Sequence, residues 1–370
     1  INGGDYCSIL VKTREGRPIK IEGNTDSKVT KGGTSARVQA SVLSLYDTSR
    51  LRSPMVKAKR GFDNVSWDEI DKAVAGKLEA NPNANIRLLT STVISPSTKK
   101  VFAAFAAKYP NTKVVSYDAL SYSGMLMANM ASKGKSEIPD YDFAKAKTIV
   151  SIDADFLGTW ISPVEFTKGY TSNRKVSKEK PDMSRHYHFE SRMSLTGSNA
   201  DYRVAVLPSE LGVVALNLYD AVTGSNTAGG VKLKDEAKQA RLKEAAEWLK
   251  KNRGASLVVS GCNDVNVQLV VNAINDALGN YGNTISFDNA SMLRQGSDSS
   301  VKTLVNELVG GQVNILMVHD CNPVYDHPMG ASLADAMAKA DLSISFASNM
   351  NETAEKCGYV CPDHHYLESW

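Results

Sequence analysis

The stretch TIVSIDAD, residues 148–155, decides the fold class, because it begins with a short apolar segment of the kind that forms a buried strand. Two carboxylates, Asp153 and Asp155, follow this segment. Apolar segments of the same kind recur at 86–89, 114–115, 257–259, 284–287, 314–318, 342–346 and 359–361. Segments with helical periodicity lie between them, such as the stripe Val267, Val271 and Leu278 that ends before Gly279. Short apolar strands that alternate with helices predict parallel sheets covered on both faces, which is an α/β fold.

Helix starts in the sequence support this pattern. Ser66 and Glu69 have the spacing of a capping box, in which each side chain satisfies a free backbone donor at the start of a helix. Ser95-Pro96 predicts another start, since proline is tolerated in the first turn. The first sixty residues differ, because the strand-like segments 8–12 and 18–21 flank a hairpin turn at 15–17 and predict a small β-rich domain. Polar residues at 166–184 and 223–230 predict a surface excursion and a linker.

Composition excludes several classes of protein. The 370 residues are 42% hydrophobic and 22% charged, which is ordinary for a globular protein. The formal net charge of +3 is too small to indicate nucleic-acid binding. No apolar segment approaches the roughly 18 residues that a membrane-spanning helix needs. The chain begins at Ile1 without a methionine, so we expect it to be a piece of a longer protein.

Cysteine and histidine clusters offer several weak candidates for chemistry. Five widely spaced cysteines do not form a disulfide framework, and Cys357 and Cys361 are expected to be buried structural thiols. His186, His188 and Glu190 alternate along one segment and would share one face of a strand, as a metal site requires, but a structural role is favoured. Three other groupings are weaker candidates, namely His364, His365 and Glu368 as metal ligands, Cys321 with His319 and Asp320 as a nucleophile, and Asp153 with Asp155 as a cation site. No catalytic residue and no metal site are therefore predicted.

Ligands of parallel α/β folds bind where strands end. The predicted strand ends fall at 90–92, 118–119, 153–155, 260–263 and 319–323. None of them contains a Gly-x-Gly-x-x-Gly loop, and no phosphate-binding loop with the Walker lysine occurs in the chain. An ordinary nicotinamide-dependent or ATP-dependent enzyme is therefore not expected.

Several segments, in order along the chain, resemble landmarks of the molybdopterin oxidoreductase superfamily. They are residues 7–11 and 15–24, residues 45–47, 50–51 and 54, residues 65–69, residues 275–280, residues 322–323, residues 351–354 and residues 362–368. The resemblance covers essentially the whole chain and implies a Rossmann-like, three-layer α/β/α architecture in two units. It also implies a bound molybdopterin guanine dinucleotide in the active members of the superfamily.

Departures from the family pattern fall at the places where cofactors would bind. Members of the family hold an iron–sulfur cluster through four cysteines in the first domain, whereas Cys7 stands alone here. No cysteine occurs near 118–123, where the resemblance places the metal ligand, and by residue type a serine such as Ser121 or Ser123 could serve instead. Asp153-Ala154-Asp155 replaces the family's Gly-x-Asn and would set carboxylates against a pyrophosphate. If a pterin cofactor were retained, the candidate residues would be Ser121, Ser123, Asp153, Asp155, Ser209, Glu210 and Asn322.

This combination is most similar to the large iron–sulfur subunit of bacterial alternative complex III. The segments that favour it are 14–20, 32–37 and 40–47. The resemblance implies a cofactor-free half of that subunit on the periplasmic side of the inner membrane, bound to the other subunits of a quinol oxidoreductase, without a membrane span of its own. Iron–sulfur clusters would lie in a C-terminal part beyond this chain. It further implies a small N-terminal domain at 1–60, a discontinuous α/β domain at 61–135 and 253–370, and an inserted α/β domain at 136–252.

Three hypotheses therefore follow from the sequence. The favoured hypothesis is a cofactor-free scaffold and docking domain within an electron-transfer complex. The second is a fragment of an active molybdopterin-dependent oxidoreductase with Ser121 or Ser123 as the metal ligand. The third is an independent small-molecule binding protein that uses the cleft expected between the two α/β units.

Overall fold

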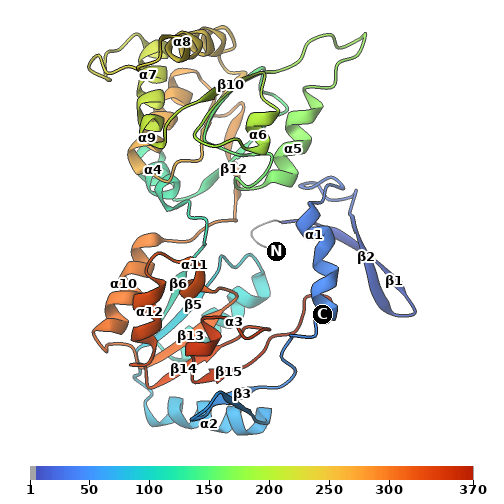
Figure 1. Cartoon of the computed structure of the whole chain (residues 1–370), viewed down its shortest axis with the longest axis vertical. Helices are drawn as coiled ribbons and strands as arrows, with labels where there is room; N and C mark the ends of the chain where they lie inside the picture. The colour runs from blue at the N-terminus through green and yellow to red at the C-terminus, as the bar shows by residue number, and fades with distance from the viewer. Residues whose placement is uncertain (1–5, 370) are drawn as a thin grey trace. The chain divides into compact units, whose positions relative to one another are not determined.

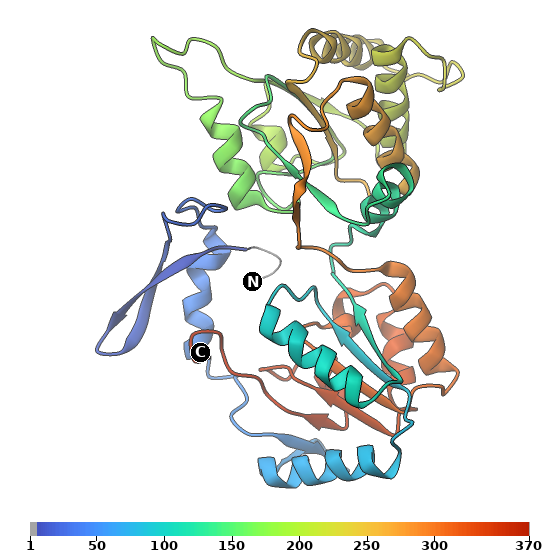
Figure 2. The same ribbon diagram turned by 180° about the vertical axis from the view of Figure 1, so that it is seen from behind.

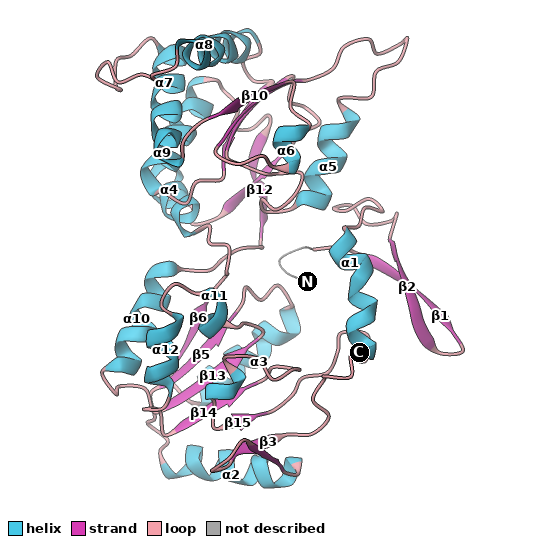
Figure 3. Ribbon diagram, viewed as in Figure 1, coloured by secondary structure: helices cyan, strands magenta, loops and turns pink. Residues whose placement is uncertain are grey.

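The computed structural model describes residues 6–369, and the chain divides into two compact units (Figure 1). The first unit comprises Ile1–Val42 and Ser123–Leu293, and the second comprises Leu43–Tyr122 and Arg294–Trp370. Each unit is an α/β body in which helices flank a sheet, as the colouring by secondary structure in Figure 3 makes plain. The predicted α/β class with mainly parallel sheets is confirmed.

The first unit is built on a four-stranded parallel sheet in the order β10-β9-β8-β11. Its strands are β8 (Thr148–Ile152), β9 (Arg185–Glu190), β10 (Tyr202–Ala205) and β11 (Ser256–Ser260). Its helices are α4 (Ser123–Lys133), α5 (Pro163–Ser172), α6 (Leu195–Ser198), η2 (Pro208–Glu210), α7 (Leu211–Thr223), α8 (Glu236–Lys251) and α9 (Val265–Ala277). A small antiparallel pair, β7 (Ile138–Tyr141) and β12 (Ile285–Ser291), completes the body, and the hairpin of β1 (Ile9–Arg14) and β2 (Arg17–Gly23) precedes α1 (Ala36–Ala40).

The two faces of the first sheet bury different kinds of side chain. Val150, Tyr187 and Val258 point to one face and pack against α7, α8 and α9 in an apolar core. Successive residues of a strand point to opposite faces, so Ser151 and the histidines of β9 point to the other. That face packs against aromatic rings from α5 and the loop before it, including Phe156, whose ring centroid lies 5.3 Å from that of His186.

The second unit has a seven-stranded sheet in the order β4-β3-β15-β14-β13-β5-β6. Its strands are β3 (Met55–Lys57), β4 (Phe62–Asn64), β5 (Ile86–Thr90), β6 (Thr112–Ser116), β13 (Ile315–His319), β14 (Leu342–Ser345) and β15 (Tyr359–Val360). Its helices are η1 (Ser41–Tyr46, which begins at the end of the first unit), α2 (Trp67–Ala80), α3 (Pro96–Lys108), α10 (Asp298–Val309), α11 (Pro323–Asp326), α12 (Gly330–Met337) and η3 (Ala354–Lys356). Apolar residues of α2 and α3 cover one face of the sheet, and those of α10 and α12 cover the other.

The predicted helix starts are confirmed. The Ser66 hydroxyl accepts from the Glu69 amide at 3.3 Å, and the Glu69 carboxylate accepts from the Ser66 amide at 2.7 Å, which completes the capping box of α2. Ser95 caps α3, and Pro96 occupies its first turn. No helix among residues 6–369 is both long and apolar enough to cross a membrane.

The unit boundaries differ from the predicted ones. The resemblance implied that the chain returns near Arg253 to the domain formed by residues 61–135. Instead, β11 pairs with β8 in the first unit, and the return to the second unit falls at Leu293–Arg294. The outward crossing lies at Tyr122–Ser123 rather than near residue 135, because α4 packs along α9, as both Figure 1 and the reverse view in Figure 2 show. Residues 1–60 do not form one domain, since the hairpin belongs to the first unit and residues after Val42 belong to the second. Residues 1–5 of the predicted N-terminal domain lie outside the described part of the chain.

The segment predicted as a surface excursion at 166–184 is only partly exposed. Residues 166–172 belong to α5, in which Phe166 and Tyr170 are each 3% exposed and pack under the sheet. This segment contains too few apolar residues to show the stripe of a helix in its sequence. Pro163, in the first turn, was the feature of the sequence that could have indicated α5.

The thiols of Cys357 and Cys361 are buried, as predicted. Burial raises the pKa of Cys357 to about 12 and that of Cys361 to about 11. Because the thiolate is the reactive form, alkylation at pH 8 should be about a hundredfold slower or more for these two thiols in the folded protein than in urea. Mass spectrometry of iodoacetamide-treated protein measures the rates. Equal rates in the folded and unfolded protein would contradict the burial of these thiols.

Candidate functional site at the carboxyl edge of the first sheet

The order of strands in the first unit marks one place for a ligand. The chain proceeds from β8 outward through β9 to β10 and then returns to β11 on the other side of β8. In open parallel sheets, ligands bind at the carboxyl ends of two neighbouring strands from which the chain continues in opposite directions. Here that place lies between Asp153-Ala154-Asp155 after β8 and Gly261-Cys262-Asn263 after β11, and we call it the switch point.

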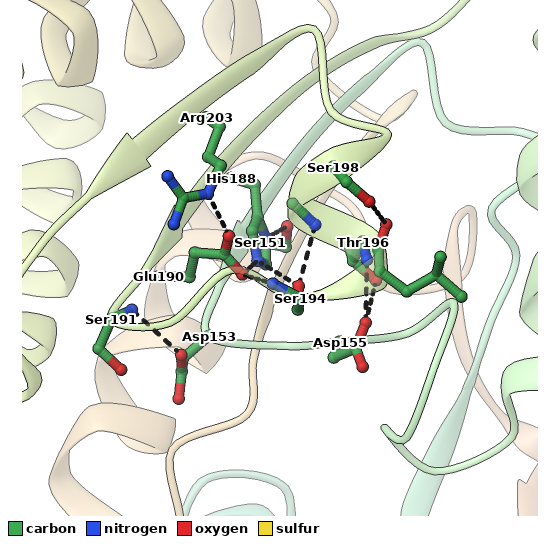
Figure 4. A network of polar contacts seen from close by, with 12 residues as sticks. Ser151, Asp153, Asp155, His188, Glu190, Ser191, Ser194, Thr196, Ser198 and Arg203 are labelled. Carbon is green, nitrogen blue, oxygen red and sulfur yellow. Dashed lines mark hydrogen bonds and ion pairs between the residues drawn. The ribbon is translucent and has the colours of Figure 1, made fainter.

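Asp153 and Asp155 are held by the loop that follows β9 (Figure 4). Asp155 Oδ1 accepts from the backbone amide of Thr196 at 3.0 Å and from its hydroxyl at 2.8 Å. Asp153 Oδ1 accepts from the amide of Ser191 at 3.4 Å. Asp153 has a backbone φ of 54°, an unusual value for a residue other than glycine. Both carboxylates therefore serve as acceptors that position the β9–α6 loop.

The two loops of the switch point pack directly on each other. A Cβ atom added at Gly261 would lie 2.2 Å from the carbonyl oxygen of Asp153, so only glycine allows this approach. The carbonyl oxygen of Ser260 accepts from Trp160 Nε1 at 3.2 Å and from Gln268 Nε2 at 3.0 Å. Side chains of the protein thus satisfy the backbone groups at this edge.

Backbone donors near the switch point also have acceptors. The amide of Gly124, in the first turn of α4, donates to Asn263 Oδ1 at 2.8 Å. At the start of α9, Asp264 Oδ1 accepts from the amides of Asn266 and Val267 at 2.8 and 3.2 Å. A phosphate group bound at a helix start needs such amides as donors. In this structure these amides already bond to the protein's own oxygens.

Ser209 and Glu210 lie at the far edge of the same sheet, after β10, two strands away from β8. Ser209 is exposed, and Glu210 accepts from the amide of Leu207 at 2.8 Å. These two residues therefore do not join Asp153 and Asp155 in one cluster.

The remaining predicted residues are divided between the units. Ser123 is buried as the first residue of α4 in the first unit, whereas Ser121 is half-buried in the second unit. Asn322, also in the second unit, follows β13, and its Nδ2 donates to Glu352 at 2.7 Å while its Oδ1 accepts from the Thr353 hydroxyl at 2.6 Å. Asn322 thus joins two loops of the second unit.

The alternating residues of β9 form a buried polar network. His186, His188 and Glu190 share one face, as predicted, and each is at most 1% exposed. His188 Nε2 lies 2.9 Å from Glu190 Oε2, and Glu190 Oε1 accepts from Arg203 Nε. Among residues 6–369, no group of three or more potential metal ligands comes together. The structural role favoured for these residues fits this geometry.

Ser151 is the member of this network that the sequence analysis missed. Its hydroxyl lies 2.7 Å from His186 Nε2 and also contacts His188 Nδ1. A single polar residue inside the apolar strand β8 was the available signal, because a buried hydroxyl requires partners.

Burial controls the charge of this network. It lowers the pKa of His186 well below its ordinary value, and it lowers the pKa of His188 although Glu190 acts in the opposite direction. Burial also works against ionisation of Glu190, but hydrogen bonds from Ser194 and Arg203 outweigh it and lower the pKa of that carboxyl. Near neutral pH the network therefore holds two neutral imidazoles beside one carboxylate.

The disfavoured candidates of the second unit have structural partners. His365 Nε2 lies 2.8 Å from the Ser44 hydroxyl, and Glu368 forms an ion pair with Arg50 at 2.5 Å, so two family-like segments from opposite ends of the chain meet. A pocket of about 530 Å³ beside them is lined by residues that include Trp67 and His364.

Cys321 does not pair with its neighbours in sequence. His319 Nδ1 contacts the Thr90 hydroxyl at 3.0 Å, and Asp320 accepts from the Ser91 hydroxyl at 3.0 Å. Burial raises the pKa of Cys321 well above its ordinary value, which disfavours the nucleophilic thiolate.

Comparisons with known proteins give the family. No protein-family profile matches the chain. The chain is 21% identical over 407 aligned positions to the molybdopterin-binding-like subunit of menaquinone reductase of Nitratidesulfovibrio vulgaris, covering 96% of this chain and 56% of that protein. It is also 25% identical over 232 positions to the molybdopterin-containing subunit of the arsenate respiratory reductase of a Shewanella species, covering 57% of this chain and 25% of that protein. The chain is a member of the molybdopterin oxidoreductase superfamily.

The solved structures agree with this superfamily at the level of the fold. Acetylene hydratase from Pelobacter acetylenicus matches with a TM-score of 0.68 and 10% identity, over 97% of this chain and 61% of that one. Nearly the whole of this chain aligns with the menaquinone reductase subunit, but it spans only about half the length of that relative.

Proposed function

We propose that this chain is a cofactor-free scaffold and docking domain of a membrane-bound quinol oxidoreductase. The observation that carries the proposal is the switch point, where the protein's own oxygens occupy backbone donors and two carboxylates replace the family's Gly-x-Asn. In this proposal the domain belongs to the large iron–sulfur subunit of an alternative complex III on the periplasmic side of the membrane. Electron transfer then takes place through iron–sulfur clusters in other parts of the protein.

The residues present do not fit a dinucleotide pyrophosphate at the switch point. The side chains of Asn263 and Asp264 already accept hydrogen bonds from backbone amides at this edge. A phosphate group would have to displace them in order to bind those amides. The phosphate would also meet Asp153 and Asp155 at short range, where like charges repel by several kcal/mol, roughly 4 at an effective dielectric constant of 20. The close contact of Gly261 with Asp153 leaves no gap between the two loops. We therefore derive no chemical step through a pterin.

The relatives support membership in a larger assembly. One relative is named as a subunit of menaquinone reductase, and its name describes it as molybdopterin-binding-like. Segments 14–20, 32–37 and 40–47 resemble alternative complex III in particular. A fold that once held a dinucleotide can keep a packed interior without it and still offer surfaces to partners.

The hairpin β1–β2 is the surface that we assign to docking. Like charges lie directly opposite across its strands, since Lys12 pairs with Lys20 and Arg14 pairs with Arg17, and such pairs destabilise a sheet. Within the hairpin, Lys20 also forms an exposed ion pair with Glu22 at 2.5 Å, which offsets only part of this positive charge. Leu10 is 55% exposed and Ile19 is 49% exposed. A two-stranded hairpin is marginally stable by itself. A partner subunit with carboxylates on its surface would relieve the repulsion and cover the apolar side chains.

Charge reversal in the hairpin tests this docking role. We expect the double variant Lys12→Glu/Lys20→Glu to weaken attachment of the subunit to its complex about tenfold or more, because carboxylates would then face carboxylates. Lys234→Glu/Lys243→Glu changes the charge equally on exposed positions outside the hairpin and should leave assembly unchanged. Co-purification of the complex from its native host measures the outcome. Equal assembly of both variants would overturn the docking surface but not the absence of a cofactor.

The second candidate function is a fragment of an active molybdopterin-dependent oxidoreductase that binds molybdopterin guanine dinucleotide. The similarity to a molybdopterin-containing arsenate reductase subunit favours it. In that case Ser121 or Ser123 would be the metal ligand, and Asp153 and Asp155 would have to turn away from the cofactor. The two hydrogen bonds that Thr196 donates to Asp155 weigh against such a rearrangement.

A further inference from the structure

A continuous line of hydrogen bonds crosses the polar face of the first sheet. Tyr170 Oη lies 3.2 Å from His186 Nδ1, and His186 Nε2 lies 2.7 Å from Ser151 Oγ. Ser151 Oγ contacts His188 Nδ1, and His188 Nε2 lies 2.9 Å from Glu190 Oε2. Each of these five residues is at most 3% exposed, so water does not compete for their bonds. We call this line of residues the polar chain.

The carboxylate at one end fixes the direction of every bond in the polar chain. Glu190 accepts from Arg203 Nε and from the amide of Ser194, as an ionised carboxylate does. His188 Nε2 must therefore carry the hydrogen that faces Glu190, and His188 Nδ1 must accept from the Ser151 hydroxyl.

The same logic extends to the other end of the polar chain. A hydroxyl has a single hydrogen, so Ser151, which donates to His188, must accept from His186 Nε2. His186 Nδ1 is then an acceptor, and Tyr170 donates to it. Near neutral pH all the hydrogen bonds point toward Glu190.

A second complete arrangement exists with one more proton. If His188 gains a hydrogen on Nδ1, that nitrogen donates to Ser151, and Ser151 must donate to His186 Nε2 instead. The hydrogen of neutral His186 then sits on Nδ1 and points to Tyr170. Tyr170 in turn donates to the carbonyl oxygen of Asn199, which lies 3.1 Å from its hydroxyl. No hydrogen bond of the polar chain is lost, and the added proton remains on His188.

Both ends of the polar chain contact the termini of α6. Ser194 is the N-cap of α6, its amide donates to Glu190 at 3.0 Å, and its hydroxyl lies 3.4 Å from His188 Nε2. Asn199 is the C-cap of the same helix. Between them, Thr196 is the residue that Asp155 holds at the switch point. Reversal of the polar chain therefore adds a bond from Tyr170 to the C-cap of α6 and places a positive charge on His188 beside the N-cap.

We propose that the polar chain is a one-proton switch, in which uptake of a proton by His188 reverses every hydrogen bond as far as Tyr170 and alters the hold on α6. The device is independent of any cofactor, because all its parts belong to this chain.

The charges around the polar chain direct the proton to His188. The carboxylates of Glu190, Asp153 and Asp155 favour the charged form of the His188 imidazole. Arg203, on β10, forms an ion pair with Glu190. Arg174, which is paired with Asp201, disfavours a charge on His186.

The pH of the switch follows from the lowered pKa of His188. Because burial depresses that pKa in the folded state, the switch operates below about pH 6.5, the ordinary value for histidine. The unfolded chain binds the proton first, so the folded state loses stability as the pH falls from that value toward the folded pKa.

Nitrogen NMR of the 370-residue protein labelled at its six histidines tests the switch. Nitrogen shifts distinguish a protonated ring nitrogen from a bare one. On acidification we expect His188 to gain its second hydrogen while His186 stays neutral and moves its hydrogen from Nε2 to Nδ1, with the same midpoint. In Ser151→Ala, His188 should still take up its proton. The hydrogen of His186 should no longer move, because the hydroxyl that links the two rings is absent. Ser256→Ala, which removes another buried hydroxyl of the sheet, should preserve both events.

Three results of the wild-type titration would each overturn the proposal. The first is a His186 that keeps its hydrogen on Nε2 while His188 becomes charged. The second is a His186 that itself becomes doubly protonated. The third is a His188 that stays neutral until the protein unfolds. The wild-type titration decides the matter even if Ser151→Ala fails to fold.

Discussion

Replacing Glu190 with alanine is expected to lower the free energy of unfolding of the first unit by about 3–5 kcal/mol, the range for breaking a buried ion pair. Glu190 is 1% exposed and accepts from Arg203, from the Ser194 amide and from His188. Its removal leaves a guanidinium, an imidazole N–H and a backbone amide without their acceptor. The alanine also leaves a cavity that a sheet interior does not readily fill.

Glu247→Ala is the matched control for Glu190→Ala. Glu247 lies on α8 of the same unit and pairs with Lys250, but its side chain is 71% exposed. Exposed pairs contribute about 0–1 kcal/mol, so this variant should be close to wild type. Urea unfolding followed by circular dichroism compares the two variants. Similar small losses for both would mean that the polar chain does not stabilise the first unit.

Replacing Arg87 with alanine should destabilise the second unit by about 3 kcal/mol. Arg87 is 4% exposed, and its guanidinium donates to both carboxylate oxygens of Glu307 at 2.6 and 3.0 Å. It also donates to the carbonyl oxygen of Ile86 at 2.9 Å. Bidentate pairing of this kind ties α10 to β5, and alanine provides none of these donors.

Lys113 provides the control for Arg87, because it contacts the same carboxylate from the surface. Its ammonium lies 3.4 Å from Glu307 Oε1, and its side chain is 65% exposed. Lys113→Ala should therefore cost at most about 1 kcal/mol by the same urea measurement. If Lys113→Ala lowered the free energy of unfolding as much as Arg87→Ala, the stability would depend on the net charge near Glu307 and not on the buried bidentate pair.

Local patterns predicted the elements of this fold well. The alternation of apolar strands with helical stripes gave the α/β class, and the spacing of Ser66 and Glu69 gave the start of α2. The domain boundaries did not follow from these patterns. The apolar stripe of α9 has the same form whichever sheet it covers, and only the pairing of β11 with β8 shows that it belongs to the first unit.

The candidate site was predicted in part. The sequence placed Asp153 and Asp155 at a strand end and identified them as unfavourable for a pyrophosphate. It could not show that Thr196 holds Asp155 or that Asn263 bonds to the Gly124 amide, because these contacts join residues far apart in the chain. Tyr170 was missed because it lies in a segment that is polar in sequence but packs under the sheet.

In the proposed scaffold, no molybdopterin cofactor binds in this domain. The most direct test is elemental analysis for molybdenum and tungsten, together with a fluorescence assay for released pterin, on the native protein that contains this chain. We expect neither molybdenum, tungsten nor pterin, and we expect any iron to belong to clusters outside this domain. About one molybdenum or tungsten atom and one pterin cofactor per chain would contradict this expectation, and Ser121 and Ser123 would then be the first residues to replace.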